Sequence, residues 1–574
     1  MPHSNDQVAA ALEELAELLA ITGGDPFRIR AYERAARAVA GHAQDLDELD
    51  EKALDAIPAI GTRIAAKIRQ LLTTGHVEEL DELRAQVPAG LRALLAVPGL
   101  GPKRAHQVYE ELQVTSMAEL VEALRAGRLR TLRGWGLASE TRLAEAIQQH
   151  QEAQGRLQLG VALDLAEELV ESLGRLRAVR QASYAGSLRR MCETIGDIDL
   201  LVSSSEPASV MAEFAELKAL ASVPMQGPTK AVGMTQTGIH VDLRVIAPKS
   251  FGAALLYFTG SKAHNIHLRR IAQRSGLKLS EYALERSDGA EVIASASEEE
   301  IYEALGLSFI PPTLREDRGE IEAAQAHALP RLVELRDLRG DLHTHTNLTD
   351  GIEPLDAMVA AATARHYRYF GVTDHAPLLA MQRMTKEKAL EQRAQLRRLQ
   401  AGAGPVLLHG SELNIQPDGG LDWDDEFLAG FDVLVASIHS AFTMSKDQMT
   451  ARLIRAIEHP FVNIIGHPTG RSIGHRPPVS FDPEAVFAAA ARAGTALEIN
   501  GFPDRLDLND ELCRVAGALG AVFAISSDAH ATRHLDNLRY GVATAQRGWI
   551  RPEQVINTWP IARLRRFLAK GRKR

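Results

Sequence analysis

The sequence predicts a multidomain protein of the α+β and α/β classes, because three regions of different pattern follow one another along the chain. Its 574 residues exceed what one hydrophobic core usually supports, since domains typically hold roughly 100 to 200 residues. Residues 1 to 155 have Leu, Ile and Ala at spacings of three and four, which predicts short amphipathic helices. From 160 to 325 strand-like and helical segments mix. Beyond 340 short apolar runs alternate with helical segments, as in parallel β/α units.

Composition and charge narrow the class of protein. A hydrophobic fraction of 45% with 24% charged residues is typical of a soluble globular protein, and no stretch approaches the roughly 20 apolar residues that cross a bilayer. The N-terminus has neither a basic start nor a small-residue cleavage site, and Cys192 and Cys513 offer no disulfide framework. We therefore expect a cytoplasmic protein without membrane contact. The net charge of -9 argues against indiscriminate binding to polyanions, although basic grooves can still form locally.

Three segments of the helical region repeat one design, in which apolar residues precede a Gly-containing turn and a helix. They are residues 57–68, 97–108 and 132–143. Such a turn directs backbone N–H groups and a helix N-terminus outward, which suits a phosphate group. The segments resemble helix-hairpin-helix motifs, which implies DNA contacts at Gly99, Gly101, Lys103, Gly134 and Gly136. The first copy has Ala59 where the motif prefers glycine, and the alternative for each copy is a tight turn that stabilises a helical bundle.

Three aspartates of the central region form a candidate nucleotidyl transfer site. Asp197 and Asp199, in GDIDLLV, are two apart and therefore face the same side of a predicted strand. Asp242, in VDLRV, lies on a second predicted strand and can complete the cluster. Hard carboxylate oxygens suit Mg²⁺ or Mn²⁺, and two such ions can activate a 3′-hydroxyl and stabilise the leaving pyrophosphate. The alternative is a surface pair of aspartates on an edge strand.

The segment GSLRR precedes these strands and supplies candidate phosphate contacts. Gly186 and Ser187 form a turn whose backbone can approach phosphate oxygens, because glycine has no side chain. Arg190 can bind the same oxygens through its planar fork. A GS turn followed by GDxD is shared by nucleotidyltransferases in general, so these residues alone leave the acceptor open.

The next motif, YFTGSKAHN (257–265) followed by Arg269, resembles the nucleotide-selecting segment of family X DNA polymerases, the group that includes vertebrate DNA polymerase beta. The resemblance implies a palm and thumb of the polymerase beta type, with Tyr257 and Phe258 excluding the ribose 2′-hydroxyl. It also implies that Asn265 contacts the incoming base and Arg269 the templating strand. The nucleotide-binding positions that it implies in addition are Gly186, Ser187, Arg190, Gly196 and Gly260. Lys262 stands where polymerase beta has an acid.

The resemblance extends from about residue 7 to 325, since LGLSFIPPTLREDRGEIEAA (305–324) looks like the end of the family's thumb. Within the first hairpin, Lys67 stands where polymerase beta has the Schiff-base lysine of its deoxyribose-phosphate lyase. Lys67 is therefore a candidate lyase nucleophile. Pairing of its ammonium with DNA phosphate is the alternative.

Histidines concentrate after residue 340, where eleven of the chain's twenty lie. Nine residues are candidate metal ligands, and nearly every one follows an apolar run of the predicted β/α units: His343, His345, Asp350, His375, Glu412, His439, His467, Asp528 and His530. In a β/α barrel such side chains meet where the strands end, and nine nitrogen and oxygen ligands suit a three-metal cluster of Zn²⁺, Mn²⁺ or Fe²⁺. The set resembles the PHP (polymerase and histidinol phosphatase) phosphoesterase domain. Glu498 and Asn500 either line the same mouth or support the ligands from the core.

Polymerase and PHP modules in this order resemble the bacterial and archaeal family X polymerases over nearly the whole chain. The resemblance implies six segments: a lyase-like helical domain (1–90), a fingers-like helical subdomain (91–155), a palm nucleotidyltransferase subdomain (156–248), a thumb (249–325), a linker (326–338) and a PHP domain (339–574). It further implies gap filling in base excision repair together with 3′-5′ exonuclease, 3′-phosphatase and abasic-site endonuclease activities. The expected partners are gapped or primer-template DNA and dNTPs, and we expect a nucleoid-associated monomer.

Three other functions compete with this one. The first is a DNA-end phosphoesterase whose polymerase core only positions DNA, and the retention of all three aspartates weighs against it. The second is a small-molecule phosphatase of the histidinol phosphate type, for which hairpin motifs have no use. The third is a DNA-binding scaffold for repair partners, which would leave two complete sets of metal ligands idle.

Overall fold

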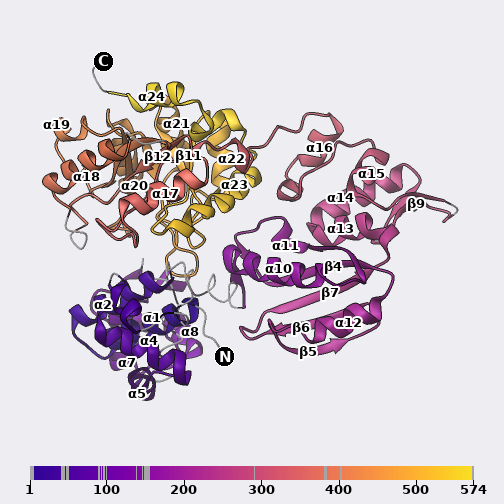
Figure 1. Ribbon diagram of the computed structural model, residues 1–574, viewed down its shortest axis with the longest axis horizontal. Helices are drawn as coiled ribbons and strands as arrows, with labels where there is room; N and C mark the ends of the chain where they lie inside the picture. Colours follow the sequence, from indigo (N-terminus) through magenta and orange to yellow (C-terminus); the bar gives the residue numbers. More distant parts are fainter. Residues whose placement is uncertain are drawn as a thin grey trace.

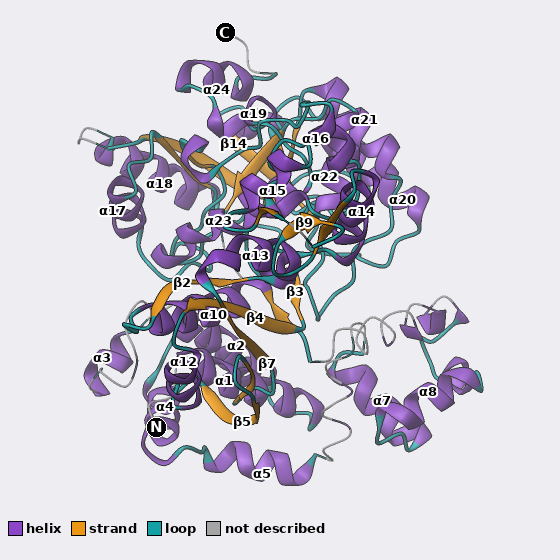
Figure 2. Cartoon of the chain, turned by 90° about the vertical axis from the view of Figure 1, so that its right-hand side faces the viewer, coloured by secondary structure: helices purple, strands orange, loops and turns teal. Residues whose placement is uncertain are grey.

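The computed structural model contains four parts in chain order: a helical region, a palm sheet, a thumb and a C-terminal barrel (Figures 1 and 2). It describes the chain except residues 1–4, 41–45, 47, 48, 50, 58, 88–90, 92, 93, 95, 96, 98, 99, 138, 142, 145, 146, 148–154, 290, 380–383, 401–403 and 572–574. Within the described residues, no helix combines the length and the apolar character that a membrane span needs.

The helical region forms one hydrophobic core that runs from Val8 to Ile147. It therefore spans both N-terminal segments that the sequence distinguishes. Its described helices are α1 (Asn5–Ile21), α2 (Pro26–Ala40), α3 (Glu51–Ala56), α4 (Thr62–Thr74), α5 (Glu78–Gln86), α7 (Pro102–Leu112), α8 (Met117–Arg125) and the 3-10 helix η2 (Arg128–Thr131). The amphipathic spacing explains this arrangement, because each helix is too short to be stable without a buried face.

The palm sheet has five strands in the order β2-β4-β7-β6-β5, with β4 and β7 parallel at its centre. The strands are β2 (Val179–Tyr184), β4 (Asp197–Ser204), β5 (Leu220–Gln226), β6 (Lys230–Thr235) and β7 (His240–Ile246). Helices α10 (Leu159–Gly174) and α12 (Pro207–Ala215) pack their apolar faces on it. The short helix α11 (Gly186–Arg189) follows β2, and β1 (Leu157–Gln158) pairs with β3 (Thr194–Ile195) beside the sheet.

The thumb combines helices with a small antiparallel sheet of order β10-β9-β8. Its elements are α13 (Phe251–Thr259), α14 (Lys262–Arg274), β8 (Leu277–Leu279), β9 (Leu284–Arg286), β10 (Val292–Ala294), α15 (Glu298–Ala304) and α16 (Glu320–Gln325), with η3 (Pro248–Ser250) and η4 (Pro312–Leu314) between them. The predicted linker holds the 3-10 helix η5 (Leu335–Asp337), and its Val333 is fully buried against the barrel.

Seven parallel strands in chain order form the nearly closed C-terminal barrel that the sequence predicts. A parallel bridge between Thr344 and Ala529 joins the first strand to the last. The strands are β11 (Gly340–Asp341), β12 (Tyr369–Val372), β13 (Val406–Asn414), β14 (Val433–Ser437), β15 (Ile464–Gly466), β16 (Ala496–Asn500) and β17 (Phe523–Ser526). The helices are α17 (Leu355–Ala364), α18 (Lys386–Leu399), α19 (Asp425–Leu428), α20 (Lys446–Glu458), α21 (Pro483–Ala493), α22 (Asp510–Ala518), α23 (Leu538–Arg547) and α24 (Ile561–Leu568), with 3-10 turns η6 (Thr532–Asn537), η7 (Pro552–Gln554) and η8 (Ile556–Thr558).

The barrel packs directly on the palm. A Cβ on Gly160 of α10 would lie 3.0 Å from Cγ of Pro503 and 3.3 Å from the hydroxyl of Tyr540, both from the barrel. Leu506 and Tyr540 belong to the buried cluster of the palm. These contacts make the palm and the barrel one packed body, whereas the helical region keeps a core of its own.

Candidate functional sites

The three predicted aspartates lie on the adjacent palm strands β4 and β7. The parallel register places Asp199 directly opposite Asp242, and Asp197 precedes Asp199 on the same face of β4. Asp197 is exposed and the other two are half-buried. Burial, and then the charges of Asp197 and Asp242, raise the pKa of Asp199 to about 7. Carboxylates that repel one another in this way fit a divalent cation with hard oxygen ligands.

Gly186 lies against this cluster. A Cβ on it would stand 2.2 Å from Oδ2 of Asp199, and its φ of +60° is one that side-chain-bearing residues rarely adopt. The backbone N–H of Ala185 donates to the carbonyl of Asp199 (2.8 Å), which fixes the turn to β4. Ser187 is half-buried on α11, and a Cβ on Gly196 would come within 3.0 Å of Arg156. The GS turn therefore reaches the aspartates because glycine occupies position 186.

Arg190 joins the palm to the thumb. Its Nε donates to Oε1 of Glu316 (3.0 Å) and its Nη1 to the carbonyl oxygen of Thr259 (2.6 Å). A Cβ on Gly260 would lie 3.2 Å from that Nη1, so glycine leaves room for the guanidinium. The second terminal nitrogen, Nη2, makes only a 4.0 Å contact with the sulfur of Cys192 within the described structure. Arg190 thus keeps donor capacity for a ligand.

The predicted nucleotide-selecting residues lie on α13 and α14. The side-chain amide of Asn265 donates to the carbonyl of Tyr257 (2.7 Å), and the guanidinium of Arg269 stands 5.8 Å from the Tyr257 ring centre. The rings of Tyr257 and Phe258 meet edge to face at 5.1 Å. Arg244, two residues after Asp242 on β7, stacks on Phe258 at 4.4 Å. The motif contained no signal for Arg244, although its spacing from Asp242 places both on one face of the strand.

The nine predicted ligands of the C-terminal site converge where the barrel strands end. His343 and His345 follow β11 in extended backbone and do not belong to the strand itself, because β11 ends at Asp341. Glu412 lies within β13, the remaining histidines and Asp528 follow their strands, and Asp350 comes from the first loop. Three groups have ligand atoms within 4.8 Å of one another: His345, Asp350, His375 and His530; His343, His345 and Asp528; and His375, Glu412 and His439. His467 joins the third group through Oε1 of Glu412, 3.0 Å from its Nε2.

Unpaired buried nitrogens show that this donor set fits metal ions. Nε2 of His343, Nδ1 of His345 and Nδ1 of His467 are buried and have no hydrogen-bond partner within the described residues. Such atoms are costly unless a ligand occupies them. Burial lowers the pKa of His343, but the nearby carboxylates, with Glu498 first, outweigh burial and raise this pKa well above its ordinary value. Asp528 is also held at φ +54°, a strained backbone conformation of the kind that clusters at functional sites.

Glu498 and Asn500 support the ligands from the core. Oε1 of the fully buried Glu498 lies 2.7 Å from Nδ1 of His343, and its other oxygen accepts the backbone N–H of His467 (2.6 Å). The amide of Asn500 donates to Oδ2 of Asp528 (3.0 Å). A carboxylate on the far ring nitrogen orients a ligating histidine. The sequence left two roles open for Glu498 and Asn500, lining the mouth of the site or supporting the ligands from the core. The observed contacts fit the supporting role.

Arg505 is a residue of this site that sequence reasoning missed. Its Nε lies 3.5 Å from Oδ2 of Asp528, and its side chain is 23% exposed. None of its terminal nitrogens donates a hydrogen bond within the described part of the chain. Arg505 follows β16 in a loop without a motif, so only its position after a strand could have pointed to it.

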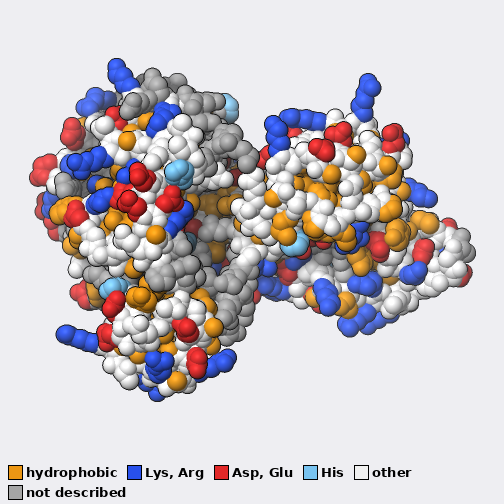
Figure 3. Space-filling view, turned by 90° about the horizontal axis from the view of Figure 1, so that it is seen from below, with side chains coloured by type: hydrophobic (Ala, Val, Ile, Leu, Met, Phe, Trp, Pro, Cys, Tyr) orange, Lys and Arg blue, Asp and Glu red, His pale blue; other side chains and the backbone are white. Residues whose placement is uncertain are grey.

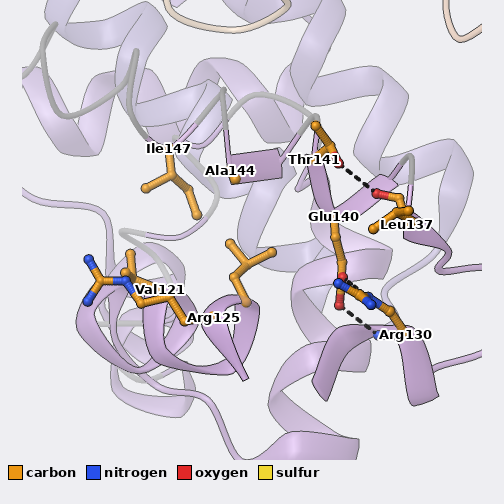
Figure 4. A pocket seen from close by; sticks show the side chains of 9 residues that line it. Val121, Arg125, Arg130, Leu137, Glu140, Thr141, Ala144 and Ile147 are labelled. Carbon is orange, nitrogen blue, oxygen red and sulfur yellow. Dashed lines mark hydrogen bonds and ion pairs between the residues drawn. The ribbon is translucent and has the colours of Figure 1, made fainter. Parts of the chain in front are cut away.

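The described residues include parts of all three hairpins. Gly101 precedes α7 as its N-cap, whereas Gly99 and the side chain of Lys103 lie outside the described residues. Gly134 has φ +85°, and Cβ atoms on Gly134 and Gly136 would meet nothing within 4 Å. A pocket of about 440 Å³ adjoins this third hairpin, where Glu140 accepts a hydrogen bond from the backbone N–H of Arg130 (3.0 Å) (Figure 4). Basic and acidic side chains intermingle on the face seen in Figure 3.

Lys67 is engaged by a carboxylate. Its Nζ lies 2.7 Å from Oε2 of Glu79, which also accepts from the hydroxyl of Tyr32 (3.2 Å) and pairs with Arg28. Burial raises the pKa of Glu79, but Lys67 and Arg28 outweigh burial and lower it. This ion pair holds the Nζ of Lys67 against Glu79, so attack on an aldehyde would first have to break it.

Family models match the helical region, the thumb and part of the C-terminal barrel. A DNA polymerase beta thumb model matches residues 254–316, and a PHP domain model matches residues 341–493. A helix-hairpin-helix domain model matches residues 3–77, and a SAM-like helix-hairpin-helix tandem matches 51–115 and 91–149.

Relatives resemble the whole chain or parts of it. The DNA polymerase/3′-5′ exonuclease PolX of Bacillus subtilis (strain 168) is 34% identical over 573 residues, which cover 99% of this chain and 100% of the relative. DNA polymerase lambda of Rattus norvegicus is 26% identical over 343 residues, 54% of this chain and 56% of that protein. A probable phosphatase of Shewanella sp. (strain MR-4) is 29% identical over 247 residues, 41% of this chain and 92% of the phosphatase.

Proposed function

Because the chain belongs to the family X DNA polymerases that carry a C-terminal PHP domain, we propose that it fills short gaps during base excision repair and trims the 3′ ends it extends. The chain is a DNA-directed DNA polymerase with a phosphoesterase domain. The main support for the polymerase site is the pairing of β4 with β7, which places Asp199 opposite Asp242, with Gly186 next to Asp199. The predicted division into domains at 90, 155, 248, 325 and 338 is part of this proposal.

In the polymerase site we assign Asp197, Asp199 and Asp242 to Mg²⁺ or Mn²⁺. When bound, two such ions lower the charge of a triphosphate and favour an ionised 3′-hydroxyl. The protein positions the triphosphate through the Gly186–Ser187 backbone and Arg190. Tyr257 and Phe258 contact the sugar.

In the PHP domain we assign all nine ligands to a cluster of three Zn²⁺, Mn²⁺ or Fe²⁺ ions, which would supply Lewis acidity and activated water for phosphodiester hydrolysis. Glu498 holds the ring of His343 in its ligating orientation. Arg505 directs its terminal N–H groups to a non-bridging phosphate oxygen, since an arginine fork matches that group. The side chains thus orient the scissile phosphate, and abasic-site cleavage and 3′-phosphate removal need the same orientation.

DNA reaches these sites through contacts of the helical region. We assign phosphate contacts to the turns at Gly101, Gly134 and Gly136, and contact with the template to Arg269. For Lys67 the ion pair with Glu79 favours phosphate contact over lyase chemistry. We propose that the protein acts as a monomer on nucleoid DNA.

The experiment that tests this function uses a 5′-labelled duplex with a one-nucleotide gap, with Mn²⁺ and with or without dNTPs. Asp199→Ala should lose extension and keep primer shortening, whereas His343→Ala should lose shortening and keep extension. Wild-type protein that shortens but never extends the primer would favour the end-processing phosphoesterase.

A further inference from the structure

The PHP domain contacts the polymerase nucleotide site through one arginine. Arg547 is the last residue of α23, and its side chain is only 10% exposed. Its Nη1 donates to the carbonyl oxygen of Arg190 (2.8 Å) and to Oε1 of Glu316 (2.9 Å). A residue of the barrel therefore touches both the palm residue assigned to the triphosphate and the thumb residue that pairs with it.

Glu316 is shared between two arginines. Its Oε1 accepts from Nε of Arg190 at 3.0 Å and from Nη1 of Arg547 at 2.9 Å. All three side chains are less than one-fifth exposed, so water screens their charges weakly. Burial raises the pKa of Glu316, but Arg190 and Arg547 outweigh burial and lower it, which keeps the carboxylate ionised.

A carboxylate with one cation partner would cancel the charge of Arg190. With Arg547 present, the same carboxylate oxygen is shared by a second cation, so Glu316 offsets less of the charge of Arg190. Arg547 is itself held in place, because its Nη2 pairs with Asp510 (2.9 Å) and Arg318 of the thumb pairs with the same carboxyl group (3.1 Å). The network thus runs without a break from the barrel to the triphosphate contact.

We propose that Arg547 is a positioning residue of the polymerase reaction: it balances Glu316 and anchors the backbone of Arg190, so that the PHP domain sets the affinity of the polymerase site for dNTP. This inference rests on the proposed role of Arg190 as a triphosphate contact. Arg547 does not touch the substrate and acts through Arg190.

The test measures KM for dNTP and kcat separately in gap filling by the full-length protein. Arg547→Gln should raise KM about five- to tenfold, which lies within the range of coupling inside one charged network, and change kcat less. Primer shortening by the PHP domain should keep its rate. The matched control is Arg539→Gln on the same helix, because Arg539 also links the barrel to the palm, through Asp164 (2.5 Å) and Glu167 (3.1 Å), but does not contact Arg190.

Repeating the substitution in a Glu316→Gln protein distinguishes an effect of Arg547 on the charge of Glu316 from an effect on the packing of the two domains. In Glu316→Gln protein the carboxylate is gone, so adding Arg547→Gln should raise KM much less than it does in wild type. An equal rise in both backgrounds, or an equal rise in Arg539→Gln, would overturn the proposal and leave Arg547 as a domain-docking residue. Arg190→Gln tests the premise: if it leaves KM unchanged, the assignment of Arg190 to the triphosphate fails, whereas a raised KM there with no effect of Arg547→Gln refutes the inference alone.

Discussion

At the scale of single residues, position 186 has the least room for a side chain next to the aspartates assigned to the polymerase site. Alanine there would place Cβ 2.2 Å from Oδ2 of Asp199 on a backbone with φ +60°. We expect Gly186→Ala to lower gap filling by a factor on the order of 100, as misplacement of a reacting group can, and to leave PHP shortening intact. Gly174→Ala is the control, because a Cβ there meets nothing within 4 Å. Single-turnover incorporation measures both variants, and equal rates for them would contradict the expectation.

The pKa of Asp199 predicts how the rate of nucleotide incorporation depends on pH. Its raised pKa, about 7, means that protonation removes a metal ligand as the pH falls through that value. Because a bound cation favours the ionised form, more Mg²⁺ should move the acid limb of the incorporation profile to lower pH. Incorporation rates measured against pH at low and high Mg²⁺ test this. An acid limb that stays in place would mean that another group controls it.

Arg505 gives the corresponding prediction for the PHP site. Arg505→Met keeps much of the side-chain volume but removes the donors aimed at phosphate, so we expect phosphodiester cleavage to fall at least tenfold, as loss of a charge-assisted contact does. Bound metal, measured by elemental analysis, should stay unchanged because Arg505 is not a ligand. Loss of metal together with activity would assign it a structural role instead.

Residues that could be assigned to the sites from the sequence carry a signal in their own segment of the chain, whereas missed residues such as Glu316 and Arg547 have partners far away in the chain. Asp197 and Asp199 could be paired because the two-residue period of a strand is local, and nearly every metal-ligand candidate of the barrel follows an apolar run. Glu316 could not be connected to Arg190 across 126 residues, nor Arg547 across 357, since no periodicity links them. The residues that tune both sites are therefore the ones that pattern reasoning missed.

At the scale of elements, the first hairpin has a strained backbone at Ala59. Ala59 stands where the motif prefers glycine, and its φ is +71°. A left-handed backbone conformation costs a residue with a side chain roughly 1 to 2 kcal/mol. Glycine at position 59 would remove this cost, but the larger conformational entropy of glycine in the unfolded chain would offset part of the stabilisation. We therefore expect Ala59→Gly to raise the unfolding free energy of the helical region by up to about 1 kcal/mol.

The control for Ala59→Gly lies in the following helix. Ala66 is exposed on α4, where glycine should cost about 1 kcal/mol. Denaturant unfolding of both variants gives opposite signs if the hairpin backbone is strained. Destabilisation by both would show that Ala59 is held by contacts that glycine loses.

At the scale of the whole molecule, shared cores predict how the chain unfolds. The barrel contributes Leu506 and Tyr540 to the core of the palm, whereas the helical region has its own core and lies below the barrel in Figure 1. We expect two calorimetric transitions, one for the helical region and one for palm, thumb and barrel together. Ligands that bind only the folded state stabilise it, so chelating the metals should lower the second transition and leave the first in place.

A substitution at Gly160 tests whether packing between the palm and the barrel makes the two unfold together. Gly160→Val forces a side chain toward Pro503, 3.0 Å from the Cβ position, and such overpacking typically costs about 1 to 3 kcal/mol. The second transition should then split, with the part that responds to metals assigned to the barrel. Gly174→Val on the same helix has open space and should leave one joint transition. If wild-type palm and barrel already melt apart, the communication proposed for Arg547 has no rigid path, because a network of hydrogen bonds transmits charge and position only while its two sides are held together.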